Sequence, residues 1–172
     1  MANNGETVKW SELRGMNVQI LSEGRSAGVI EDFYIKVKTY GQAIENTASI
    51  YALKVRTRVE GARALPASAI ETIGSDAVIV KNAEMLAREL PSLPLGSSLI
   101  SRKVVGENGR ELGTVSEIWL GTVPPSALRI AGFELANHDK RSHRRRGFTA
   151  NSVVRYEEDV IVVQEQIARH LD

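Results

Sequence analysis

The sequence contains the same pattern twice, and this internal repeat restricts the possible folds more than any other feature. A Gly-Arg pair followed by a further glycine begins at Gly24 and again at Gly109, an offset of 85 (109 minus 24). A second shared block begins at Leu65 and again at Phe148, an offset of 83 (148 minus 65). Two blocks in the same order and at nearly the same spacing predict two copies of one structural unit.

Each copy has the pattern of short β-strands joined by tight turns. Glycines at Gly24 and Gly109 favour turns, and the Asn-Gly pair at Asn108 is a strong hairpin signal. Apolar and polar residues alternate from Tyr51 to Arg56, the period of a half-buried strand. The predicted strands are 17–21, 28–37, 51–56 and 78–80 in the first copy, and 103–105, 113–120, 128–133 and 160–163 in the second.

Helices are expected only after each copy. Residues 82–90 place apolar side chains on one helical face after Asn82, a residue that can cap a helix. The prolines and the Gly-Ser run of 91–98 then interrupt regular structure, which is typical of a linker. A second short helix is predicted over 165–171. The resulting domains are 1–82, a helix and linker over 83–97, and 98–172 with the C-terminal helix.

The repeated blocks resemble the PRC-barrel family. Residues 13–18 and 28–33 are similar to the start of that domain, residues 65–70 and 77–80 are similar to its end, and the second copy runs over 99–163. The resemblance implies an all-β fold of two small, strongly bent PRC-type β-barrels in tandem, each followed by a short helix. Independently of the resemblance, the size of each unit predicts packing of the copies on each other or dimerisation, since units of about 70–80 residues are marginal alone.

The resemblance implies docking rather than catalysis. The family includes the cytoplasmic part of the photosynthetic reaction-centre H subunit and the C-terminal domain of a ribosome maturation factor. The membrane helix of the first and the different N-terminal barrel of the second have no counterpart in this sequence. Only the fold and a general docking role are therefore transferred, and the family has no shared catalytic residues to carry over.

Composition narrows the functional classes. The chain has 22 Lys and Arg against 21 Asp and Glu, a balance that disfavours a surface-wide nucleic-acid interface but allows a local basic patch. It has no cysteine, which excludes disulfides and thiolate chemistry. No apolar run approaches the roughly 18 residues that span a bilayer, and the polar start lacks a signal-peptide core. We expect a soluble, cytoplasmic protein.

One segment, 138–147, is strongly basic. Its clustered cations suit phosphate or carboxylate groups, although basic runs are also common on solvated loops. RNA, an acidic protein face or anionic lipid would each fit, and a single cluster without an anchor makes membrane association unlikely. The candidate anion- or partner-binding residues are Lys140, Arg141, Arg144, Arg145 and Arg146.

A longer connection in the first copy is a second candidate interface. The segment 34–51 exceeds its counterpart 119–128 and alternates basic and aromatic residues at its start. Aromatic anchors with a polar rim are typical of binding surfaces, while the alternative is extra cover for the core. The candidate residues are Tyr34, Tyr40 and Tyr51.

Catalytic, metal and cofactor sites are not predicted. The three histidines, His138, His143 and His170, lie among cations or in the terminal helix, so surface positions are favoured over ligation. The glycines of 106–113 do not have P-loop or dinucleotide spacing, and a hairpin explains them. The leading hypothesis is a non-enzymatic adaptor that docks a protein partner or self-associates. The alternative is an RNA- or ribosome-associated factor that uses 138–147.

Overall fold

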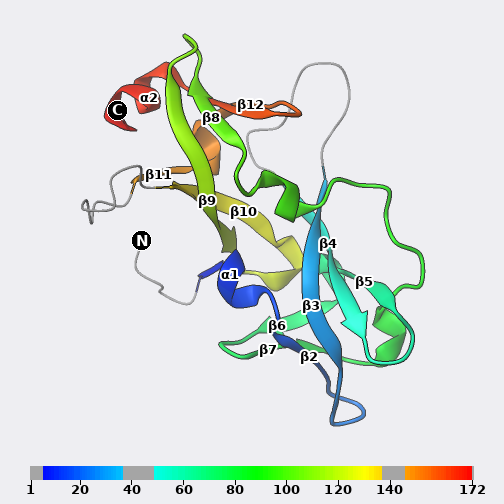
Figure 1. The fold of residues 1–172 in the computed structure, drawn as a ribbon. Helices are drawn as coiled ribbons and strands as arrows, with labels where there is room; N and C mark the ends of the chain where they lie inside the picture. The colour runs from blue at the N-terminus through cyan, green and yellow to red at the C-terminus, as the bar shows by residue number, and fades with distance from the viewer. Residues whose placement is uncertain (1–5, 37–48, 137–145, 172) are drawn as a thin grey trace.

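The computed structural model describes residues 6–36, 49–136 and 146–171. The chain is mostly β, as the sequence predicts (Figure 1). The strands of the first half and the short elements around them are β1 (Thr7–Lys9), α1 (Trp10–Leu13), β2 (Asn17–Ile20), β3 (Arg25–Lys36), β4 (Ser49–Thr57), β5 (Ala62–Pro66), η1 (Ala67–Ala69), β6 (Ile70–Ile73), β7 (Ala77–Val80) and η2 (Ala83–Met85). Those of the second half are η3 (Gly96–Leu99), β8 (Lys103–Gly106), β9 (Glu111–Gly121), η4 (Pro125–Ala127), β10 (Arg129–Leu135), β11 (Arg146–Thr149), η5 (Ala150–Ser152), β12 (Val153–Tyr156), β13 (Val160–Val163) and α2 (Glu165–Leu171).

The two halves have the same set of strand pairings. In the first half, β3 is antiparallel to β2 and β4, β4 to β5, and β6 to β7, while β2 and β7 are parallel. In the second half, β9 is antiparallel to β8 and β10, β10 to β11, and β12 to β13, while β8 and β13 are parallel. The repeated pairings follow the order of the repeated sequence blocks.

The sheet is open rather than closed into barrels. Its main path runs from β12 to β6 through both halves, and these two strands end it. The halves join where Arg129 of β10 stands opposite Ser49 of β4. Within each half, a 3-10 turn (η1 or η5) separates the last two hairpins, and no pairing of β5 with β6 or of β11 with β12 occurs among the described strands. Each half is therefore a strongly bent sheet with an unclosed seam.

The shared glycines explain why the same bend forms twice. Gly28 and Gly113 have φ values of 155° and 136°, and each lies at a register shift between the first two strands of its half. A Cβ on Gly28 would lie 2.1 Å from the backbone oxygen of Arg56. The strand can therefore bend closely over its neighbour only with glycine at this position.

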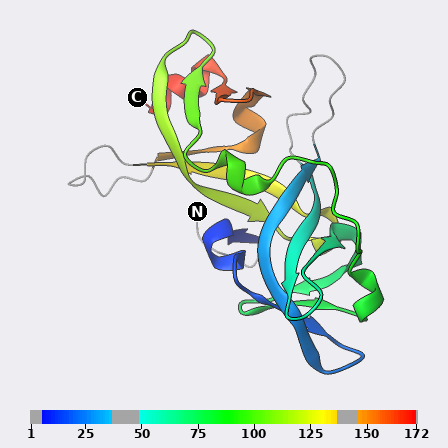
Figure 2. The ribbon, with the colours of Figure 1, turned by 45° about the vertical axis from the view of Figure 1, so that its right-hand side comes forward.

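The segment that opens each half pairs with a strand of the other half. Strand β1, at the N-terminal side of the first half, pairs antiparallel with β9 of the second half. Residues 94–97, which open the second half, pair with β3 of the first half through the Tyr34–Leu95 bridge and the Ile35 amide. Figures 1 and 2 show β1 and α1 lying between the two halves, against β9. We call this reciprocal exchange the interlock.

The interlock uses a matched pair of carboxylates. The Ser11 amide, in α1, donates to Glu117 Oε1 at 3.2 Å, and the Ser97 amide, in η3, donates to Asp32 Oδ1 at 3.1 Å. Each carboxylate also accepts the amide of its following residue. Beside them, Phe33 packs edge-on against Trp10 and flat beneath Gly96, where a Cβ would lie 2.0 Å from the ring. Each carboxylate therefore satisfies one backbone amide of a short helical segment from the other half.

Removing the Asp32 carboxylate should destabilise the protein substantially. In Asp32→Ala, the amides of Phe33 and Ser97 lose their acceptor, and each loss costs roughly 1–3 kcal/mol. We expect unfolding in urea to require about 3 kcal/mol less free energy than in the wild type. Asp32→Asn retains an acceptor oxygen, so its free energy of unfolding should fall clearly less than that of Asp32→Ala. Equal losses in the two variants would contradict a capping role.

The predicted helix over 82–90 is wrong, whereas the predicted helix over 165–171 is confirmed as α2. Only the 3-10 turn η2 forms after β7, and Asn82 makes no capping hydrogen bond there. The amide and carbonyl of Ala87 instead pair with the carbonyl and amide of Ala64, at 2.7 and 2.9 Å. The amide and carbonyl of Ala87 are thus hydrogen-bonded to the edge of β5 and cannot form the hydrogen bonds of a helix.

The buried phenol of Tyr156 should lower the free energy of unfolding at high pH. Its hydroxyl is buried without a hydrogen bond to any described residue, and burial raises the pKa of its phenol above the usual 10.0. Stability should be retained below pH 10 and should fall above it, because the unfolded phenol ionises while the folded one resists. We expect Tyr156→Phe to be more stable by about 1 kcal/mol at neutral pH. Urea titrations should show the difference widening above pH 10; a constant difference would contradict it.

Candidate functional site

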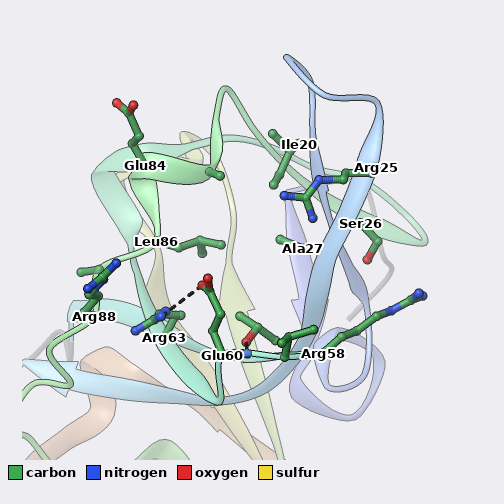
Figure 3. A pocket seen from close by; sticks show the side chains of 14 residues that line it. Ile20, Arg25, Ser26, Ala27, Arg58, Glu60, Arg63, Glu84, Leu86 and Arg88 are labelled. Carbon is green, nitrogen blue, oxygen red and sulfur yellow. Dashed lines mark hydrogen bonds and ion pairs between the residues drawn. The ribbon is translucent and has the colours of Figure 1, made fainter.

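The first half has a partly open cavity of about 850 Å³ at one end of its bent sheet (Figure 3). The β2–β3 hairpin forms one wall, the β4–β5 hairpin a second and the chain around η2 a third. We call this cavity the open mouth. It is lined by Ile20, Arg25, Ser26, Ala27, Thr57, Arg58, Val59, Glu60, Arg63, Ala83, Glu84, Leu86, Ala87 and Arg88.

Local hydrogen bonds hold the β4–β5 wall in place. The Thr57 hydroxyl donates to the Gly61 carbonyl at 2.6 Å and accepts the Glu60 amide at 3.0 Å. Gly61 has a φ of 74°, which permits the tight return of the chain. This geometry presents Glu60 and Val59 at the tip of the hairpin, beside the cavity.

Four arginines and two glutamates line the open mouth, which gives it an excess of positive charge. Figure 3 shows Arg25 on one wall and Arg63 with Arg88 on the opposite wall. Arg63 is only 15% exposed and lies 3.0 Å from the exposed carboxylate of Glu60, while Arg25 lies 2.5 Å from Glu23. Within the described part of the chain, Arg58 and Arg88 make no ion pair. Figure 3 shows Arg88 beside Arg63, whereas the Arg58 side chain extends from the hairpin tip away from both.

The remaining surface of the open mouth is largely apolar. Ile20 and Ala27 are buried residues of the first half that reach the cavity, and Leu86 projects between the arginine-bearing walls (Figure 3). Val59, at the hairpin tip, is 92% exposed. A ligand would therefore meet apolar contacts and guanidinium groups together.

The second half has an arginine at the matching position but uses it differently. Arg63 stands opposite Val55 of β4, and Arg146 stands opposite Leu135 of β10, each two residues before a repeated block. The Arg146 guanidinium donates to the carbonyls of Leu112, Leu171 and Ala136 at 3.1, 3.0 and 3.3 Å. This arginine is thus engaged inside its own half.

Helix α2 and the 3-10 turn η2 follow equivalent strands, but they differ in structure. Helix α2 follows β13 as η2 follows β7, and it packs against β8 and β11 (Figure 1). Ala168 and Leu171 of α2 are buried. The Leu171 carbonyl at its C-terminal end is one of the acceptors of Arg146, a favourable arrangement for a cation.

The structure tests only part of the predicted basic site. Lys140, Arg141, Arg144 and Arg145 lie outside the described residues. Arg146 is described, and its three bonds to backbone carbonyls direct it inward rather than toward an external anion. The arginines that face a cavity are those of the first half, which the sequence did not single out. The available signal was the matching place of Arg63 and Arg146 in the repeat.

The residues of the predicted aromatic interface also lie partly outside the described residues, and the described ones differ in exposure. Tyr34 is 4% exposed and packs with Ala52 beneath Leu93 and Leu95, so it covers the core rather than forming an exposed anchor. Burial, with the nearby Asp32 and Glu31 carboxylates, raises the pKa of the Tyr34 phenol. Tyr51 is 46% exposed, and Tyr40 lies outside the described residues.

The described residues hold no candidate metal site, because no three or more of their His, Asp or Glu side chains are arranged to hold a metal ion. None of the helices within the described ranges is long and apolar enough to cross a membrane. In comparisons with known proteins, no family model matches the chain, and no curated protein matches it significantly.

Proposed function

We propose that the chain is a non-enzymatic docking adaptor built from two PRC-barrel-like halves. The open mouth carries this proposal, because one half of the repeat is covered by its own helix α2 while the corresponding place in the other half is a cavity. In the second half, a polypeptide segment (α2) covers this position. A polypeptide is therefore the natural occupant of the open mouth in the first half. The partner is another protein or a second copy of the chain.

Several potentially reactive groups support binding rather than catalysis. The Asp32 and Glu117 carboxylates accept backbone amides, and the Arg146 guanidinium donates to backbone carbonyls. These groups stabilise the join between the halves and the position of α2. The alternative of RNA binding rests on 138–147, of which only 146 and 147 lie within the described residues.

Site-specific crosslinking tests the adaptor proposal. A photoreactive amino acid at position 59, on the exposed rim of the open mouth, should crosslink one polypeptide reproducibly in cells. The same amino acid at position 123, another exposed valine, serves as the matched control. We expect mass spectrometry to identify a partner at 59 that is missing at 123. Identical crosslinks from both positions, or none from 59, would contradict docking at the open mouth.

A further inference from the structure

We infer that the open mouth binds an acidic, amphipathic helical segment of a partner protein. This inference rests on the proposed docking function and adds the chemistry of the occupant. Three features of the described residues support it: the helix seen at the matching place, the charge of the walls, and the apolar floor.

The matching place in the second half defines the shape of the occupant. There, α2 places apolar residues such as Ala168 and Leu171 against the sheet. Its C-terminal carbonyl accepts a hydrogen bond from Arg146, which corresponds to Arg63 in the register of the first half. A short helix that enters the open mouth would place its negative end near Arg63 in the same way.

The walls of the open mouth define the charge of the occupant. Arg58 and Arg88 have no ionic partner among the described residues, and Arg63 has only the neighbouring Glu60 within ion-pair distance. Carboxylates on the occupant would pair with these guanidiniums, whose planar donor groups match a carboxylate. Partner lysines and arginines would be repelled, so the site discriminates by charge.

The floor of the open mouth requires an apolar face as well. Ile20, Ala27 and Leu86 offer apolar surface, and Val59 is exposed at the rim. A free phosphate or a nucleic-acid backbone would leave this surface uncovered. Apolar side chains at helical spacing would bury it, and this burial favours a peptide over RNA.

The test uses the full-length protein and a labelled peptide of about three helical turns. The peptide carries leucines along one face and glutamates along the other, and a second peptide replaces the glutamates with glutamine. We expect fluorescence anisotropy to detect binding of the acidic peptide and about tenfold weaker binding of the glutamine peptide. Affinity for the acidic peptide should also fall with added salt.

Three variants locate the binding site. The double variant Arg58→Glu with Arg88→Glu should weaken peptide binding at least about tenfold. The matched control, Arg14→Glu with Lys103→Glu, makes the same change in net charge at exposed residues outside the cavity and should bind normally. Val59→Asp should also weaken binding, because it places a carboxylate on the apolar rim.

Each contrary outcome has a defined meaning. Undetectable peptide binding, equal loss in the control, or preference for a single-stranded RNA oligonucleotide over the acidic peptide would overturn the inference. If position 59 still crosslinks a specific polypeptide in that case, the docking function stands and only the occupant chemistry is wrong. If no polypeptide is crosslinked and no peptide binds, both proposals fail.

Discussion

A fragment containing residues 1–90 should not fold by itself. It keeps all of β2 to β7, yet it loses β9, which pairs with β1, and residues 94–97, which pair with β3. Phe33 would lose the cover of Gly96, and the Asp32 carboxylate would lose Ser97. Because a unit of this size has a small stability margin, these losses should exceed it. Circular dichroism and amide NMR should show a largely unfolded chain.

Complementation provides the control for this fragment. Co-expressed fragments 1–90 and 91–172 contain every strand of the interlock and should associate into a folded pair. A slightly longer fragment, 1–100, regains the segment that pairs with β3 but still lacks β9, so it should show intermediate protection. A cooperative thermal transition and dispersed amide signals from 1–90 alone would show that the interlock is dispensable.

The sequence predicts the strands of each half well because their signals are local. Glycine at Gly24 and Gly109 has positive φ in both turns. Leu53 and Val55 of β4 are buried as the alternation predicts, whereas at its start Tyr51 is exposed and Ala52 is buried. The interlock gives no such signal. Strand β1 has only three residues, and its partner lies more than 100 residues away in the sequence. Pairings of this kind depend on how the halves pack, which no local pattern records.

At the candidate site, too, the sequence predicts features of a single segment but not contacts between segments that are far apart in the chain. The sequence emphasises the density of cations in 138–147, but a count of charges does not reveal that Arg146 turns inward to backbone carbonyls. The open mouth brings together Arg25, Arg63 and Arg88 from three separate segments. One of its walls is formed by residues 83–88, where Ala87 pairs with Ala64 and no helix forms.

Gly28→Ala should be among the most damaging single substitutions in the chain. The residue has a φ of 155°, and its added methyl would lie 2.1 Å from the Arg56 carbonyl oxygen, on the backbone of β4. A flexible side chain could move aside, but a paired strand cannot do so without losing its hydrogen bonds. Strain at such φ values alone costs roughly 1–3 kcal/mol, so we expect a loss of at least about 3 kcal/mol.

Gly24→Ala is the matched control for this prediction. Gly24 also has positive φ, at 61°, but no atom lies within 4 Å of the point that an added methyl group would occupy. The control therefore isolates the conformational cost, about 1–2 kcal/mol, from the steric overlap. Urea unfolding of both variants separates the two effects, and equal losses would mean that the contact with β4 relaxes without cost. Because Gly28 adjoins Ala27 on the floor of the open mouth, a larger loss in Gly28→Ala would also mean that the bend which shapes the mouth tolerates no side chain at this position.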